Sequence, residues 1–191
     1  MGWWEAERAA DGIRELAKTR SMRPSVIARR LGIRVVRVPG MLDRGNLGYG
    51  SGRWWIAIRN DDEHTIGHEL KHWWDRINGV IESTEESADM VGAALMMPSP
   101  SFADAVRRFG RNFSALARHF RATESSVALR LGEVQDVPLA LVTPQSVRVR
   151  GPEFWEWGSQ EFIRHVAKTG RPGVAVLRLH DDRRRTVVIA A

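Results

Sequence analysis

The chain's apolar and polar positions follow two periods, which predicts a mixture of helices and strands. Apolar residues recur at helical spacing in several stretches, namely 3–19, 24–32, 63–77 and 83–97. Shorter β-branched runs bounded by turn-forming residues predict strands, at 33–38, 53–59, 139–143, 147–150, 174–179 and 186–190. The glycine-rich segment 46–52 is typical of a turn rather than a strand.

Taken in order, these elements predict an α+β protein in three parts. Residues 1–100 combine N-terminal helices, a minimal sheet and a helix pair, and residues 101–137 hold two or three short helices. Residues 138–191 combine strands with a helix over 153–169, which predicts a small C-terminal α/β unit.

Polar residues mark the ends of the helix pair. Residues 60–62, Asn-Asp-Asp, are good N-cap types for the helix that starts at Glu63. Ser83 and Glu86 fit a capping box at the start of the second helix, with Ser83 as the cap. Pro98 ends this helix because the residue before a proline disfavours helical backbone angles.

Composition limits the chemistry that this chain can perform. Its 191 residues include no cysteine, which excludes disulfides, cysteine-based zinc fingers, iron–sulfur clusters and a thiol nucleophile. A metal site must therefore use histidines and carboxylates. The histidines are unevenly spread, since His64, His68 and His72 lie close together and the others are scattered.

His68, Glu69 and His72 form an HExxH motif inside the predicted helix. Residues four apart share one helix face, so both imidazoles can bind one ion while Glu69 reaches a water beside it. His64 lies two turns from His72 and is interpreted as a packing or helix-start residue. The motif therefore predicts a metal site with Glu69 as the catalytic general base.

A catalytic zinc ion usually has three protein ligands, so a third is expected downstream. The candidates are Glu82, Glu85, Glu86 and Asp89. Glu82 precedes the helix and Glu86 has the capping role, whereas Glu85 shares a face with small residues that let the two helices pack closely. We expect Glu85 as the third ligand and Asp89 as a hydrogen-bond partner of a ligand histidine.

Three segments together resemble the signatures of the ImmA/IrrE metallopeptidases. Residues 68–72 match the HExxH motif, 85–89 the ExxA(N/D) motif and 93–98 the "FAAxLLMP" motif. Residues 27–35 are similar to the family's "iAxxLGIxV" segment, and 116–120 with 130–131 resemble the helical stretch downstream. The resemblance covers residues 20–134 and leaves 138–191 uncovered.

The resemblance implies a gluzincin-like fold, with a small zincin-like domain over 1–100 and a helix-turn-helix-like segment after it. It implies a zinc ion held by His68, His72 and Glu85, with Glu69 as general base. It also implies a substrate class, because such enzymes cleave or inactivate helix-turn-helix repressors and so free phage, mobile-element or stress genes. Manganese, cobalt and iron are alternative metals at such a site.

Two positions depart from the family pattern. Lys71 replaces the glycine of the usual HELGH, a change expected on an exposed helix face. Val91 and Gly92 stand where Phe-Ala is usual, which is expected to leave more space beside the metal helix.

The motif itself supplies no donor for the oxyanion. Tyr49 is a candidate for that role or for substrate contact, with a purely structural role as the alternative. Strand 53–59 is a candidate edge for pairing with an extended substrate, and its alternative is an interior strand. The tryptophan pairs 54–55 and 73–74 are each expected to place at least one ring in the core.

Residues 113–133 approximate a helix-turn-helix pattern in basic surroundings. The basic residues are Arg107, Arg108, Arg111, Arg118, Arg121 and Arg130. A structural helix pair that packs on the peptidase core or docks a repressor is the preferred interpretation, because Arg121 occupies the usual turn-glycine position. A DNA-reading element is the alternative.

The formal net charge of +6 favours acidic or nucleic-acid partners without identifying one. No segment approaches the roughly 20 apolar residues of a membrane span, and no secretion signal is evident, so we expect a cytoplasmic protein without a membrane partner. The main hypothesis is a zinc endopeptidase that cleaves a helix-turn-helix repressor. The alternative is a DNA- or repressor-binding regulator whose metal site is structural or sensory.

Overall fold

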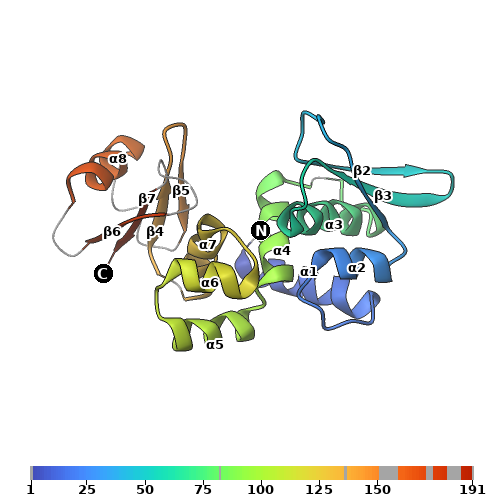
Figure 1. Cartoon of the computed structure of the whole chain (residues 1–191), viewed down its shortest axis with the longest axis horizontal. Helices are drawn as coiled ribbons and strands as arrows, with labels where there is room; N and C mark the ends of the chain where they lie inside the picture. The colour runs from blue at the N-terminus through green and yellow to red at the C-terminus, as the bar shows by residue number, and fades with distance from the viewer. Residues whose placement is uncertain are drawn as a thin grey trace. The chain divides into compact units, whose positions relative to one another are not determined.

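The computed structural model describes residues 2–81, 83–135, 137–150, 159–170, 174–179 and 186–190. They form two compact units, Met1–Ser99 and Pro100–Ala191. Each unit combines helices with its own sheet (Figure 1), so the fold is α+β. The predicted boundary after residue 100 lies one residue from this division, and residues 101–137 and 138–191 lie together in the second unit.

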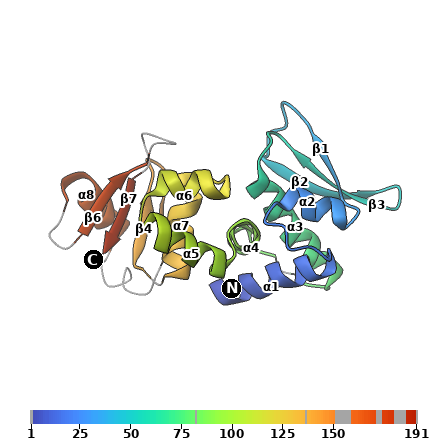
Figure 2. The ribbon, with the colours of Figure 1, turned by 60° about the horizontal axis from the view of Figure 1, so that its bottom comes forward.

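The described residues of the first unit form four helices and a small sheet. The helices are α1 (Trp3–Leu16), α2 (Pro24–Arg30), α3 (Glu63–Ile77) and α4 (Glu85–Met96), and the strands are β1 (Arg34–Arg37), β2 (Gly45–Gly50) and β3 (Arg53–Ile58). α3 lies at the centre of the unit, in contact with β2, β3 and the other three helices (Figure 2). Its buried residues Leu70 and Trp73 belong to the same apolar core as Ile13, Ile27 and Ile56.

β2 is a strand, although its glycines predicted a turn. It pairs antiparallel with β3 along its whole length, from Gly45 opposite Ile58 to Gly50 opposite Arg53. A Cβ on Gly48 would overlap the ring of Trp55, which crosses the strand at this point. The glycines therefore serve close packing, and the turn itself is confined to residues 51–52.

β3 is the central strand of the sheet, whose order is β1-β3-β2. It pairs in parallel with β1 on one side and antiparallel with β2 on the other. A substrate cannot add to β3 because both of its hydrogen-bonding sides are occupied. The predicted substrate edge at 53–59 is therefore wrong, and the interior-strand alternative is correct.

α3 and α4 cross at two glycines. A Cβ on Gly67 would lie 2.9 Å from the Cα of Gly92, and a Cβ on Gly92 would lie 3.0 Å from the backbone nitrogen of His68. The expectation that Gly92 leaves extra space is wrong, because α3 and α4 pack so closely at this point that no space remains for a side chain. Close packing of this pair through small residues is confirmed, and it brings the two polar faces together.

Lys71 is buried, with 3% of its surface exposed, and forms an ion pair with Asp75 one turn later. It lies one turn after Gly67, on the side of α3 that α4 covers. The expectation of an exposed helix face at Lys71 is therefore wrong.

α4 is capped one residue later than predicted. The hydroxyl of Thr84 accepts a hydrogen bond from the Ser87 backbone nitrogen at 3.2 Å. The capping box assigned to Ser83 and Glu86 is therefore wrong, and Ser83 is available for another role. At the other end of α4, buried Arg14 of α1 donates to the carbonyl oxygens of residues 94 and 95, at 2.7 and 3.0 Å.

Where the structure describes it, the second unit begins with three helices and continues with a sheet. Its elements are α5 (Ser99–Phe109), α6 (Phe113–Phe120), α7 (Glu124–Val134), β4 (Leu139–Val142), β5 (Val147–Arg150), α8 (Gln160–Thr169), β6 (Val174–Arg178) and β7 (Thr186–Ala190). The antiparallel sheet has the order β5-β4-β7-β6, and α7 and α8 both pack on it. The β6–β7 pairing confirms the predicted hairpin.

Several sequence predictions lie outside the described residues. They are Glu82, the first part of the predicted 153–169 helix up to residue 158, and the hairpin turn at 181–183. Within the described part of the chain, every helix is too short or too polar to cross a membrane.

Candidate metal centre

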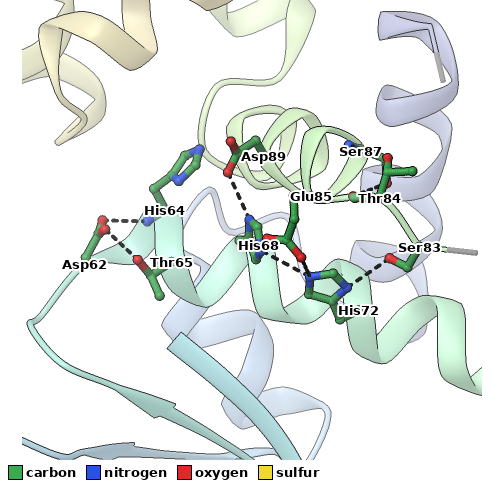
Figure 3. A network of polar contacts seen from close by, with 10 residues as sticks. All are labelled: Asp62, His64, Thr65, His68, His72, Ser83, Thr84, Glu85, Ser87 and Asp89. Atoms are coloured by element: carbon green, nitrogen blue, oxygen red, sulfur yellow. Dashed lines mark hydrogen bonds and ion pairs between the residues drawn. The ribbon is translucent and has the colours of Figure 1, made fainter. Parts of the chain in front are cut away.

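His68, His72 and Glu85 point their ligand atoms at one another (Figure 3). The two imidazole Nε2 atoms are 3.1 Å apart. The Glu85 carboxylate lies 3.2 Å from the Nε2 of His68 and 3.5 Å from that of His72. α3 supplies the histidines from successive turns and the first turn of α4 supplies the glutamate, so three predicted ligands are brought together.

This donor set fits a zinc ion. Two imidazole nitrogens and one carboxylate are the ligands that catalytic zinc sites commonly use. At zinc–ligand distances of about 2.0–2.1 Å and tetrahedral angles, ligand atoms lie roughly 3.3 Å apart. The observed separations of 3.1, 3.2 and 3.5 Å are close to that value.

Each histidine is oriented by a partner on its other ring nitrogen. The Nδ1 of His68 lies 2.9 Å from a carboxylate oxygen of Asp89, as the ExxxD spacing predicted. The Nδ1 of His72 lies 2.9 Å from the hydroxyl of Ser83. Nδ1–H donation to these oxygens leaves both Nε2 lone pairs available to a metal ion.

Ser83 is the residue of this centre that the sequence analysis missed. Residues 83 and 84 both carry hydroxyls, and a helix needs only one of them as its N-cap. The spare hydroxyl was the available signal. It lies in the short connection after α3, within reach of the last histidine on that helix (Figure 3).

The two histidines differ in their electrostatic surroundings. Burial lowers the pKa of His68, but the hydrogen bond to Asp89 and its charge outweigh this and raise the pKa overall. Burial and the neighbouring charge of His68 lower the pKa of His72. The carboxylate of Asp89 is thus the group that distinguishes the surroundings of His68 from those of His72.

Glu69 lies next to the candidate metal ligands, on the side of α3 that faces β2. It is 6% exposed, and burial raises its pKa. The charge of Glu85 raises the pKa further, while the charges of His68 and Arg76 lower it by less than the total increase. A Cβ on Gly45 would lie 2.7 Å from a Glu69 carboxylate oxygen, so β2 passes directly over this side chain. A raised pKa suits a carboxylate that must accept and return a proton near neutral pH.

Tyr49 lies away from the three ligands. Its ring packs on Trp54, with the centroids 4.9 Å apart. It is four residues along β2 from Gly45, which is about 13 Å at strand spacing. Tyr49 therefore lies beside Trp54, further along β2, and not at the cluster of His68, His72 and Glu85.

The remaining histidine of the group and the tryptophan pairs are also placed. His64 is half-buried at the start of α3, where Asp62 accepts a hydrogen bond from its backbone nitrogen at 3.0 Å, and burial lowers its pKa. This agrees with the helix-start interpretation. Trp73 is buried, and Trp54 packs against the core while Trp55 is partly exposed, so each pair does contribute to the core.

The helix-turn-helix-like pair α6–α7 faces inward. Arg121 between the helices adopts a left-handed conformation, with φ 54°. Every residue of α7 is buried or half-buried, and Arg130 is completely buried, whereas the other arginines of the basic set are exposed. α7 thus offers no exposed face to a DNA groove, which favours a structural helix pair.

No family model and no curated protein matches this chain. Among solved structures, it is similar to a Mycobacterium tuberculosis transcriptional regulator, with a TM-score of 0.62 and 14% sequence identity. The similarity covers 97% of this chain and 74% of the regulator. At this identity the likeness concerns the fold alone, and it extends over both units.

Proposed function

We propose that the chain is a metal-dependent peptidase whose ion is held by His68, His72 and Glu85. The observation that carries the proposal is the convergence of these ligand atoms, all within 4.8 Å of one another, beside the buried carboxylate of Glu69. The resemblance to the ImmA/IrrE metallopeptidases and the donor set both favour zinc. The proposed substrate is a helix-turn-helix repressor.

Lewis-acid polarisation of a water and of the scissile carbonyl is the chemistry that zinc supplies in such a site. Glu69 accepts the proton of the attacking water and delivers it to the leaving amine. Asp89 and Ser83 hold the imidazole rings of His68 and His72 in register through their Nδ1 atoms. Each protein group thus has one role in a single hydrolytic cycle.

The edge strand β2 is the proposed place for the substrate backbone. β2 ends the β1-β3-β2 order, so its outer hydrogen-bonding groups have no strand beside them in the described part of the sheet. Gly45 lies against Glu69, so a peptide that pairs with β2 passes the catalytic carboxylate.

A regulator without peptidase activity is the second candidate. The name of the structural neighbour, transcriptional regulator, favours a regulatory role, and in this interpretation the metal site stabilises or senses. Binding of a repressor through the α6–α7 region is then the main activity, and Glu69 has no chemical task.

The test compares the zinc-loaded chain with its Glu69→Gln variant. Both are incubated with the helix-turn-helix protein encoded nearest to the gene and with random dodecapeptides, and products are identified by mass spectrometry. We expect cleavage by the wild type and a loss on the order of 10² to 10⁴-fold in the variant. Zinc content should stay the same, because the substitution leaves the three ligands untouched.

Glu161→Gln on α8 serves as the matched control, because this exposed glutamate lies in the other unit. It should cleave as the wild type does. If the Glu69→Gln variant inactivates the repressor to the same extent as the wild-type chain does, the peptidase proposal is wrong and the regulatory candidate is favoured.

A further inference from the structure

An aromatic and cationic cluster lies along β2 from the catalytic carboxylate. Tyr49 on β2 packs against Trp54 on β3, and the guanidinium carbon of Arg76 on α3 lies 5.9 Å from the centre of the Trp54 ring. We call Tyr49, Trp54 and Arg76 the β2 cluster. No residue of the predicted metal centre belongs to it.

The β2 cluster is on the same side of the sheet as Glu69. Alternate residues of a strand face one side, so Gly45, Leu47 and Tyr49 share a face. Gly45 lies against Glu69 of α3. Tyr49 contacts Trp54, whose ring lies beside Arg76 of α3, so this face of β2 is the one that α3 covers. Arg76 follows Glu69 by two helical turns, about 10 Å along α3, which is close to the 13 Å or so between Gly45 and Tyr49 on β2.

The cluster is accessible and carries a cation. Tyr49 is 62% exposed and Arg76 is exposed. No acidic side chain within the described ranges forms an ion pair with Arg76, although its charge acts on Glu69. An exposed guanidinium beside the Trp54 ring, with the Tyr49 ring packed on that ring, suits a carboxylate whose aliphatic stem lies on the aromatic surface.

We propose that the β2 cluster is a specificity subsite for an acidic side chain of the substrate. A peptide antiparallel to β2 runs from Tyr49 toward Gly45, and antiparallel pairing is the more stable arrangement. The acidic residue therefore lies about four residues to the amino side of the residue beside Glu69. This inference rests on the proposed peptidase function and adds a preference for Asp or Glu at that position.

A binding measurement separates the subsite from catalysis. The probes are fluorescent, end-blocked dodecapeptides of serine and threonine with one central Glu, Gln or Lys, and the protein is the zinc-loaded Glu69→Gln chain. We expect the Glu peptide to bind about fivefold more tightly than the Gln peptide, the scale of an exposed ion pair. An added Arg76→Ala change should reduce the ratio to one, and Arg76→Glu should make the Lys peptide the tightest binder.

Two matched variants separate charge from packing. Arg30→Ala removes an exposed arginine from the end of α2 and should leave the Glu-to-Gln ratio unchanged. Tyr49→Ala should weaken the Glu and Gln peptides by the same factor, because it removes aromatic surface and no charge. A role of Arg76 in helix stability alone would lower the melting temperature and leave the ratio intact.

Cleavage of the same peptides by the wild-type chain shows how far the cleaved bond lies from the Glu residue. Scission about four residues after Glu supports the inference. A Glu preference in binding without any cleavage contradicts the peptidase function and leaves the subsite supported. Cleavage without a Glu preference, absence of peptide binding, or a ratio that survives Arg76→Ala overturns the subsite.

Discussion

The helix pairs α3–α4 and α6–α7 use their polar residues in opposite ways. In α3–α4, the ligand atoms of His68, His72 and Glu85 face one another across a short distance. In α6–α7, Glu133 accepts from buried Arg130 at 3.1 Å and from Arg150 of β5 at 3.2 Å. The first pair directs its polar atoms toward a shared point, and the second satisfies them within the protein.

The difference shows how a helix pair with a structural role is distinguished from one that forms a candidate binding site. Buried polar groups are stable when protein partners satisfy them, and Arg130, Glu133 and Arg150 meet that condition within their own unit. In α3–α4 the Nδ1 atoms of the two histidines have separate partners, Asp89 and Ser83, while their Nε2 atoms lie only beside each other and the Glu85 carboxylate in the described contacts. The two Nε2 atoms and the carboxylate form a donor set that could hold a cation.

The largest expected effect is the response of the first pair to zinc. At a zinc concentration about a thousandfold above its Kd, the wild type should gain about 4 kcal/mol in free energy of unfolding. His72→Ala should lose this gain, because two ligands bind zinc far more weakly than three. Thermal unfolding with zinc and with a chelator measures both.

His119→Ala in α6 is the matched control, because it removes an exposed histidine from the second pair. It should keep the full zinc response. An equal loss in both variants would mean that the two pairs do not differ in the way described.

The second pair should respond to the loss of its buried cation. Arg130→Met should lower the free energy of unfolding by about 3 kcal/mol, the low end for a broken buried pair, because Arg150 still contacts Glu133. Denaturant unfolding provides the measurement, and zinc affinity should not change. Arg118→Met on exposed α6 surface should cost little, and a similar cost for both arginines would contradict the structural role of Arg130.

Gly92→Ala should test the close crossing of α3 and α4. Alanine normally favours a helix over glycine by about 1 kcal/mol, but here its Cβ would lie 3.0 Å from the His68 nitrogen. We expect a net loss of about 2 kcal/mol, typical of overpacking, together with weaker zinc binding. Chemical denaturation and zinc titration measure the two effects.

Gly12→Ala on α1 provides the comparison, because the three atoms nearest to its added Cβ all belong to the side chain of Trp74, the first at 2.9 Å. That ring can shift, so the change should be nearly neutral. Equal effects of the two substitutions would show that helix propensity, and not the crossing, governs Gly92.

The smallest expected effect concerns Ser83. Ser83→Ala removes the hydroxyl beside the Nδ1 of His72 and should weaken zinc binding about tenfold. Competition with a chromophoric chelator measures the affinity. Ser83→Thr keeps the hydroxyl and should restore most of it, whereas unchanged affinity in Ser83→Ala would remove Ser83 from the metal centre.

Local sequence rules were enough to locate the candidate ligand set. The helical period fixes His68 and His72 on one face, and the next helix begins soon enough to return Glu85 and Asp89 to them. The same local rules predicted the α+β class and most helices, because periodicity and end signals act within a few residues.

Other features depend on a neighbour distant in the sequence, or on which of two similar residues is used, and these became visible only in the folded chain. Gly45 and Gly48 form a strand because β3 pairs with them, and Lys71 is buried one turn after Gly67, which packs against Gly92 of α4. Ser83 orients His72 because Thr84 takes the cap. Pairing and burial are properties of the packed chain, so no local pattern of residues contains them.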